Sequence, residues 1–140
     1  MRTPNKYGLE FHHLGLAVKE PESAIRFLSG LGYEIGPTFR DELQNVNLML
    51  GTGSDMPAVE IIYPTETPGP LVTILKARTS MIYHICYASR NRDESLRLLE
   101  ADQNRISLLS PPQPAVLFGG RKVSFYVLVG FGVIEILEPG

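Results

Sequence analysis

The segment Val59-Glu60-Ile61-Ile62-Tyr63-Pro64 returns near the end of the chain as Ile134-Glu135-Ile136-Leu137-Glu138-Pro139. Each copy is preceded by an apolar segment with a histidine: FHHLGLAV at 11–18 contains His13, and IYHICYA at 82–88 contains His84. The order histidine and then glutamate therefore occurs twice in 140 residues. Such repetition is typical of a duplicated structural unit, and it predicts that two imidazoles and two carboxylates come together.

The composition is that of an ordinary soluble protein, and it argues against nucleic-acid-binding, membrane-spanning and disulfide-bonded proteins. The chain is 44% hydrophobic and 20% charged, with a formal net charge of -2, so no basic stripe is present to bind a nucleic-acid backbone. No apolar run approaches 18 residues, so we expect no membrane span. No apolar segment follows residues 1–6, so we expect no leader peptide. The single cysteine, Cys86, excludes an intramolecular disulfide and favours a cytoplasmic protein.

Each copy has the pattern of a strand, a helix and three further strands. Alternation and β-branched content predict strands at 11–18, 33–35, 46–50 and 58–63, and again at 83–88, 106–109, 123–127 and 132–137. The first helix opens at Pro21 with an apolar stripe of Ala24, Phe27, Leu28 and Leu31, and the second is capped by Asn91 and buried through Leu96 and Leu99. Segments 36–43 and 111–114 read as loops.

The two copies define modules 8–66 and 80–140, joined by a short helix or turn at 68–78. His84 follows His13 by 71 positions, whereas Glu135 follows Glu60 by 75. The difference of four predicts an insertion in the second module, for which the proline-rich segment 111–114 is the candidate.

His13, Glu60, His84 and Glu135 each lie within a predicted strand of mostly apolar residues. A carboxylate in such a strand is costly to bury unless it is paired or bound to a cation. Two imidazoles and two carboxylates suit one divalent ion of Zn, Fe, Co, Ni or Mn. Four protein ligands leave a coordination position open on a five- or six-coordinate ion, as catalysis requires.

The neighbours of these residues favour ordinary packing. His12 and Glu138 leave the opposite strand faces from His13 and Glu135, so we expect packing or exposure for both. Cys86 shares the face of His84, where it acts as a small buried apolar group.

From Phe11 to Pro139 the chain resembles the vicinal oxygen chelate superfamily, which contains glyoxalases, bleomycin resistance proteins and dioxygenases. The segments that carry the resemblance are HLGLAV from His13, EIIYP from Glu60, YHICY from Tyr83 and IEILE from Ile134. Within the superfamily, GVIEIL at 132–137, QNV at 44–46 and PGPL at 68–71 are similar to the methylmalonyl-CoA epimerase branch. The resemblance implies an α+β fold in which residues 1–140 form one domain, with two βαβββ modules that form a curved mixed sheet around a central cleft.

The resemblance also implies a function. His13, Glu60, His84 and Glu135 would bind the metal, which would hold the carbonyl of an acyl thioester such as an acyl-CoA, and Glu135 would transfer the proton of the adjacent carbon. The family position of Glu60 is often Gln or Glu. The second acid or base of an epimerase is not evident, because the strand after QNV reads Asn47-Leu48-Met49; Glu42 and Tyr126 are candidates. The segments 118–121 and 127–131 also differ from the epimerase pattern, which leaves the acyl group open.

Two other functions remain open. A glyoxalase I-type lyase uses similar ligands, although the segment after Glu60 lacks the Asn-Trp that lyases often carry. A non-catalytic small-molecule binding protein of the same fold usually loses the ligands, whereas this chain keeps all four. The family also implies a homodimer, with the metal site either within one chain or shared between two.

Overall fold

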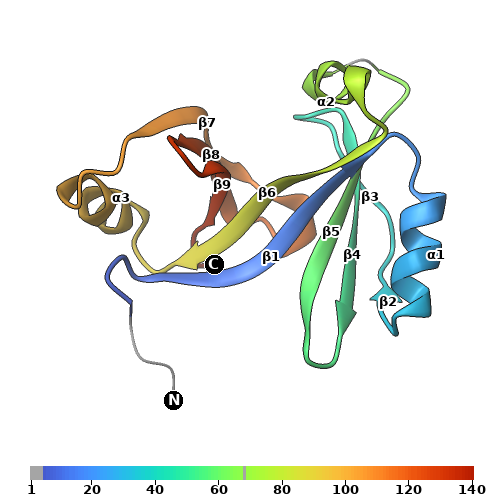
Figure 1. Cartoon of the computed structure of the whole chain (residues 1–140), viewed down its shortest axis with the longest axis horizontal. Coiled ribbons are helices and arrows are strands. Elements are labelled where there is room, and N and C mark those ends of the chain that lie inside the picture. The colour runs from blue at the N-terminus through green and yellow to red at the C-terminus, as the bar shows by residue number, and fades with distance from the viewer. Residues whose placement is uncertain (1–4, 68) are drawn as a thin grey trace. The chain divides into compact units, whose positions relative to one another are not determined.

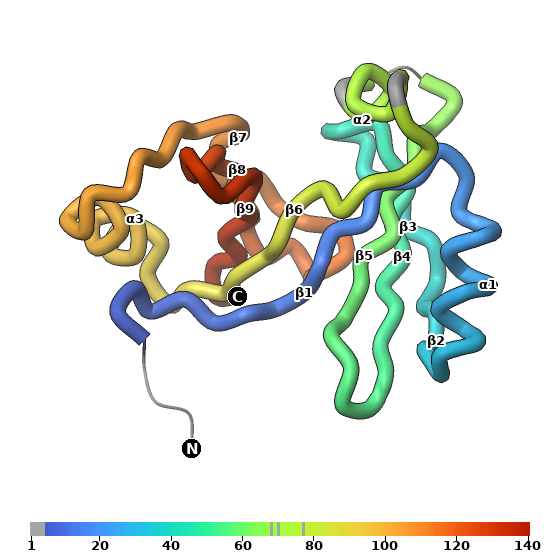
Figure 2. Tube along the Cα trace, viewed as in Figure 1, coloured from blue at the N-terminus to red at the C-terminus, as the bar shows by residue number. Residues whose placement is uncertain are grey.

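The computed structural model of the chain describes residues 5–67 and 69–140, and the backbone alone of Pro70 and Ala77. Residue 68, with which the predicted linker begins, lies outside the described residues. Within the described residues the fold has nine strands, three α-helices and two 3-10 helices (Figures 1 and 2). None of these helices is long and apolar enough to cross a membrane.

The chain forms two compact units. The central unit consists of His13–Tyr83, and the terminal unit consists of the residues up to His12 together with His84–Gly140. Strand β1 (Leu9–Val18) begins in the terminal unit and ends in the central one, and strand β6 (Ser80–Ser89) runs from the central unit into the terminal one. Each histidine of the repeat therefore stands at the point where its strand enters a unit.

The central unit is a mixed sheet with one helix on it. Its strands are β2 (Glu34–Ile35), β4 (Val46–Gly53), β5 (Met56–Pro64) and the end of β1, in that order, and β3 (Phe39–Asp41) also pairs with β4. Strands β1 and β5 are parallel, and the other pairs are antiparallel. Helix α1 (Glu22–Gly30) covers one face through Leu28, which packs with Val18, Val59 and Ile61. The opposite face carries His13 and Glu60.

The terminal unit repeats this plan. Its strands follow the order β6, β9 (Gly132–Leu137), β8 (Lys122–Leu128) and β7 (Ile106–Pro114), with β6 and β9 parallel. Helix α3 (Arg92–Ala101) covers one face, where Leu96 packs against Tyr126, Ile134 and Ile136. The other face holds a second apolar cluster and the short 3-10 helix η2 (Val116–Phe118). The helix α2 (Pro70–Ile74) and the 3-10 helix η1 (Leu75–Ala77) lie between β5 and β6 in the central unit.

The strand register confirms the duplication residue by residue. Gly15 is the register partner of Glu60 in the β1–β5 pair, and Cys86 is the partner of Glu135 in the β6–β9 pair. Each histidine precedes that partner by two residues in its strand. Because side chains two residues apart share a strand face, each unit places its histidine and its glutamate on the same face.

Two segments predicted as loops contain strands. Residues 36–43 include β3, which pairs with β4, and the proline-rich residues 111–114 belong to β7. Strand β7 pairs with β8 alone and has two register shifts, between Leu108 and Ser110 and between Ser110 and Gln113. An edge strand with bulges tolerates proline, because a missing N–H group on its outer side costs no ladder hydrogen bond. At each shift β7 has one residue more than the facing part of β8.

The predicted apolar stripe of α1 is wrong in part. Leu28 is buried, but Phe27 and Leu31 are 68% and 53% exposed. The buried side of the helix uses Ala24, Ile25 and Leu28, which pack against the central core. Phe27 and Leu31, which were predicted to be buried, lie on the outer side. A spacing of three and four residues shows that a helix has an apolar side, but it locates the centre of that side only to within about one residue.

Helix α3 begins at the predicted cap. The side chain of Asn91 accepts a hydrogen bond of 3.0 Å from the backbone N–H of Glu94, while the Glu94 carboxylate accepts hydrogen bonds from Arg97. We expect Asn91→Ala to lower the free energy of unfolding by about 1 kcal/mol, because an N–H group of the first turn loses its acceptor. Asn91→Ser, which keeps a capping oxygen, should lose much less. Urea denaturation of both variants measures the difference, and equal losses would contradict the role of the cap.

Candidate metal centre

The central unit brings His13 and Glu60 together on the face opposite to α1. His13 Nε2 lies 3.6 Å from Glu60 Oε1, and both side chains are almost completely buried. Gly15, the register partner of Glu60, has no side chain to stand between them. The small residues predicted to leave room around His13 therefore do so.

The terminal unit brings His84 and Glu135 together in the same way. His84 Nε2 lies 3.0 Å from Glu135 Oε1, and both side chains are again almost completely buried. Glu135 is flanked by its register partners Cys86 and Phe125. The ring of Phe125 stands edge-on to the ring of His84, with 5.2 Å between their centroids. Unlike the glycine of the central unit, these neighbours enclose the pair in apolar surroundings.

The terminal pair has the spacing of two neighbouring metal ligands, and the central pair comes close to it. Ligand atoms about 2.1 Å from one ion, at octahedral or tetrahedral angles, lie about 3.0–3.4 Å apart. The distance of 3.0 Å in the terminal unit falls in this range, and the 3.6 Å of the central unit is slightly longer. All four side chains are of the types that hold metal ions, and all are buried. The donor set, an imidazole and a carboxylate from each unit, suits a divalent ion of the zinc and iron class.

Tyr126 does not share the face of Glu135. Its hydroxyl accepts a hydrogen bond from Arg92 and donates one to Ser124, and its ring packs in the α3 core. Arg92 also lies 3.5 Å from Glu138, so Glu138 occupies this opposite face, as predicted. The hydrogen bond to Tyr126, with help from Asp93 and Glu138, raises the pKa of Arg92. The suggestion that Tyr126 is a second acid or base is therefore wrong on geometry.

The two remaining sequence residues, Glu42 and His12, are engaged with other side chains. Glu42, on the turn after β3, has a side chain that is 82% exposed and lies 3.6 Å from Arg40 Nε. This is an ordinary surface ion pair. His12 is half-buried, and its ring stands edge-on to Phe118, with 5.2 Å between the centroids. It packs in the terminal unit, whereas His13 begins the central one.

Sequence reasoning missed the aromatic neighbours of the terminal pair. Phe125 and Phe118 belong to the apolar cluster on the face of Glu135. A signal for Phe125 was available, because it is 75 positions after Leu50, the register partner of Glu60, and so has the same offset as the glutamates. Phe118 lies in a connection whose fold has no counterpart in the first module, and no pattern pointed to it.

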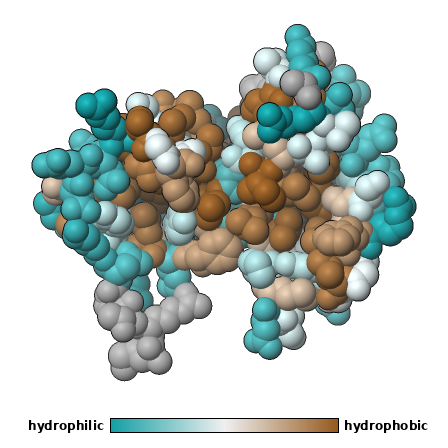
Figure 3. Space-filling model, viewed as in Figure 1, coloured by the Kyte–Doolittle hydropathy of each residue, from teal (hydrophilic) through white to brown (hydrophobic). Residues whose placement is uncertain are grey.

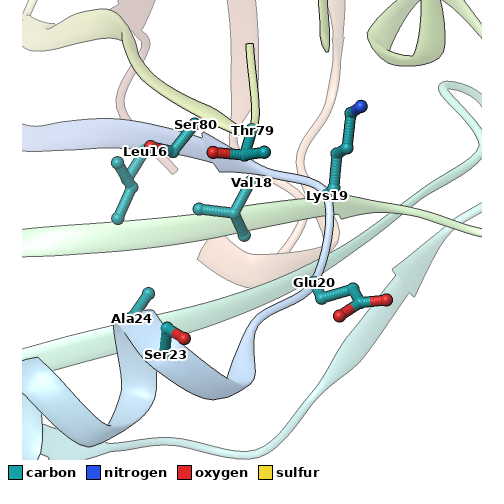
Figure 4. Close-up of a pocket in the computed structure, with 8 residues that line it drawn as sticks. All are labelled: Leu16, Val18, Lys19, Glu20, Ser23, Ala24, Thr79 and Ser80. Carbon is teal, nitrogen blue, oxygen red and sulfur yellow. The ribbon is translucent and has the colours of Figure 1, made fainter. Parts of the chain in front are cut away.

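The central unit also has a surface pocket of about 570 Å³, shown in Figure 4. It is lined by Leu16, Val18, Lys19, Glu20, Ser23, Ala24, Thr79 and Ser80. Leu16 and Val18 are even-numbered residues of β1 and pack towards α1, whereas His13 leaves the other face of the strand. The pocket is therefore separate from the His13 and Glu60 pair.

A family model described as the glyoxalase/bleomycin resistance protein/dioxygenase superfamily matches residues 12–125. No curated protein sequence matches the chain at a significant level. The matched region contains three of the four candidate ligands and stops short of Glu135.

Several solved structures have a similar fold. The methylmalonyl-CoA epimerase from Mycobacterium tuberculosis is 18% identical, with a TM-score of 0.75 over 100% of this chain and 93% of that one. A hypothetical protein from Bacillus halodurans C-125 is also 18% identical, with a TM-score of 0.75 over 94% and 95%. A variant of the Streptomyces coelicolor methylmalonyl-CoA epimerase, in complex with 2-nitronate-propionyl-CoA, is 18% identical, with a TM-score of 0.71 over 94% and 97%. At this identity the likeness concerns the fold.

Proposed function

The chain belongs to the glyoxalase/bleomycin resistance protein/dioxygenase superfamily, and on that basis we propose that it is a divalent-metal-dependent isomerase or epimerase. It would move a proton at the carbon next to the carbonyl of an acyl thioester, in the manner of a methylmalonyl-CoA epimerase. The observation that carries the proposal is the matched pair of buried histidine and glutamate side chains, one in each unit, at equivalent register positions.

We assign His13, Glu60, His84 and Glu135 as the four ligands of one ion. A buried carboxylate needs a cation or an equivalent set of donors, and each unit holds one such carboxylate beside an imidazole. Since the two pairs have the same position in the repeat, one ion shared by both would explain why both copies keep the same residue types. The sharing takes place either within one chain or between the two chains of a homodimer.

A bound divalent ion would draw electron density from the thioester carbonyl and so make the neighbouring C–H bond more acidic. Glu135 is the group that accepts this proton, because its buried carboxylate lies between Cys86 and Phe125 of the apolar cluster in the terminal unit. His84 Nε2 lies 3.0 Å from it, a spacing that fits two ligands of the same ion. Cys86 and Phe125 on either side keep water away from it.

The acyl thioester is suggested by the proteins of similar fold. Two of those described above are methylmalonyl-CoA epimerases, and one of them holds a propionyl-CoA derivative. For this chain an acyl-CoA substrate and a homodimer are part of the proposal.

The test is proton exchange in deuterated water. The protein is stripped with a chelator and reloaded in turn with Zn²⁺, Co²⁺, Ni²⁺, Mn²⁺ or Fe²⁺, and mass spectrometry follows deuterium uptake at the α-carbon of propionyl-CoA and methylmalonyl-CoA. We expect uptake with at least one metal and none in the stripped protein. Turnover of the hemithioacetal of methylglyoxal and glutathione, with no exchange in either thioester, would instead identify a lyase. Inactivity with all metals in both assays would leave a binding protein.

A further inference from the structure

The terminal unit holds a second pair of side chains that can bind a metal ion, His12 and Cys86. His12 lies on β1 and is the last residue of that strand in this unit, and Cys86 lies on β6. A ring nitrogen of His12 and Cys86 Sγ lie within 4.8 Å of each other. Neither residue is among the four ligands assigned above, so the pair is a separate cluster of metal-binding groups.

The separation of the two atoms suits a single ion between them. With bond lengths like those of zinc, about 2.3 Å to sulfur and 2.1 Å to nitrogen, one ion spans ligand atoms up to about 4.4 Å apart. Atoms within 4.8 Å of each other therefore need at most a small rotation of a side chain to reach the same ion. An imidazole and a thiolate together suit copper and zinc, whereas hard ions such as Mg²⁺ prefer oxygen ligands.

Contacts with η2 hold the imidazole of His12 in place. The ring of Phe118 stands edge-on to it, with 5.2 Å between the centroids. Phe118 belongs to a closed loop, in which the N–H of Ala115 donates to the carbonyl of Arg121 and the N–H of Phe118 donates to the carbonyl of Ala115. Phe118 also packs on the apolar cluster that contains Cys86. Because the loop orders one ligand in advance, less conformational entropy is lost when an ion binds.

The surroundings of the thiol favour an ion with a single charge. Cys86 is 0% exposed, and hydrophobic residues lie over the strands of this unit (Figure 3). Its buried cluster also contains Ala115, Val123, Phe125 and Leu137. A thiolate and a monovalent cation form a neutral pair, whereas a divalent ion on one thiolate leaves a net charge among apolar side chains. Thiolate ligands also select soft Cu⁺.

The carboxylate nearest in the sheet is engaged elsewhere. Glu135 is the register partner of Cys86, and its Oε1 lies 3.0 Å from His84 Nε2. In the proposed metal centre both of these groups bind the divalent ion, which balances the charge of the carboxylate. The thiolate is therefore the anion that a cation beside His12 would neutralise.

We propose that His12 and Cys86 bind one soft monovalent ion of the Cu⁺ class, with the imidazole and the thiolate as its ligands. The thiol gives up its proton to solvent as the bond between sulfur and metal forms. The ring of His12 is half-buried, so an ion reaches the pair from that side. This site goes beyond the proposed reaction and does not depend on it.

The test uses Ag⁺, a soft monovalent ion that, unlike Cu⁺, is stable in air. The full chain is titrated with Ag⁺ by calorimetry in a chloride-free buffer that contains Zn²⁺, and element-resolved mass spectrometry after dialysis counts both metals. We expect one Ag⁺ per chain and an unchanged content of Zn²⁺. Release of Zn²⁺ by Ag⁺ would place the silver on the four assigned ligands and overturn the inference. Silver bound to a chain that retains no Zn²⁺ would contradict the proposed function alone.

Two variants separate the pair from a lone thiol. His12→Phe keeps a ring against Phe118 but has no nitrogen, and we expect it to weaken Ag⁺ binding by at least about tenfold. Cys86→Ser removes the soft ligand and should weaken binding by more than about 100-fold. Unchanged affinity in His12→Phe would mean that the thiol binds silver alone, which overturns the role of the imidazole. If Cys86→Ser fails to fold, Cys86→Ala replaces it.

His84→Ala is the matched control for the imidazole. His84 is a buried histidine two residues from Cys86 in the same strand, but it is assigned to the divalent ion. We expect His84→Ala to lose Zn²⁺ and to keep its affinity for Ag⁺, and His12→Phe to do the opposite. Equal loss of silver affinity in both variants would overturn the assignment of His12. Circular dichroism of each variant confirms that it is folded.

Discussion

Glu135→Gln is expected to lower the rate of α-proton exchange by about 10²–10⁴-fold and to leave the fold intact. The amide has the shape of the carboxylate and keeps an oxygen, so the buried site beside Cys86 and Phe125 is filled as before. It accepts no proton at neutral pH, and the loss of a general base has this magnitude. The rate of deuterium uptake into the preferred thioester measures the effect, and the circular dichroism spectrum reports the fold.

Glu60→Gln is the matched control for that variant. Like Glu135, Glu60 is almost completely buried and occupies the equivalent register position, and its Oε1 lies 3.6 Å from a histidine Nε2. It differs in that it lies in the central unit. The resemblance to the epimerase branch implies that glutamine is tolerated there, so the exchange rate should fall by less than about tenfold. Equal losses in the two variants would mean that carboxylate charge alone matters. Full activity of Glu135→Gln would remove Glu135 from the proton transfer.

The repeat explains why most of the fold could be predicted. The strand patterns around the histidines recur after 71 positions, and those around the glutamates recur after 75. An element predicted in one module is therefore supported by its counterpart in the other, and the order of strands and helices follows for both modules. The same repeat gave each module one histidine and one glutamate. The histidine and the glutamate of a unit share a sheet face only if their strands pair in the right register. That register is the same in both units, because Gly15 pairs with Glu60 and the equivalent Cys86 pairs with Glu135.

The errors lie where the two modules differ or where tertiary packing decides. Strand β7 includes a proline-rich segment that has no counterpart in the first module, and pairing at a sheet edge overrides its loop composition. The exposure of Phe27 depends on how α1 is rotated against its sheet, which a stripe of residues on one helix does not determine. Tyr126 was suggested as an acid or base because of its hydroxyl group, without regard to the strand face on which it lies. Strand alternation places it on the face that packs against α3.

The second large effect concerns metal binding. We expect His13→Ala to lower the affinity for the ion by more than about 100-fold, because the loss of a group that only supports a ligand already costs about 10–100-fold. His84→Ala should do the same. His12→Ala is the control, since His12 packs on Phe118 and is not assigned as a ligand of that ion. Element-resolved mass spectrometry after dialysis gives the number of ions retained per chain.

The stoichiometry of these variants decides between one shared ion and two separate ones. If His13, Glu60, His84 and Glu135 hold a single ion, each of the two alanine variants keeps three ligands but binds that ion more than about 100-fold more weakly, so the metal content after dialysis falls below half of the wild-type value. If each unit holds its own ion, each variant keeps half of the metal of the wild type. Unchanged metal content in both would remove the histidines from the site.

A mixture of the two variants then locates the shared site. When His13→Ala and His84→Ala chains are unfolded together and refolded, a site shared between subunits regains metal in mixed dimers, in which one of the two sites combines the intact His13 of one chain with the intact His84 of the other. About a quarter of the wild-type metal content is expected from random pairing of such chains. A site within one chain regains none, because every chain lacks a ligand. The recovery of α-proton exchange in the same mixture should follow the metal content.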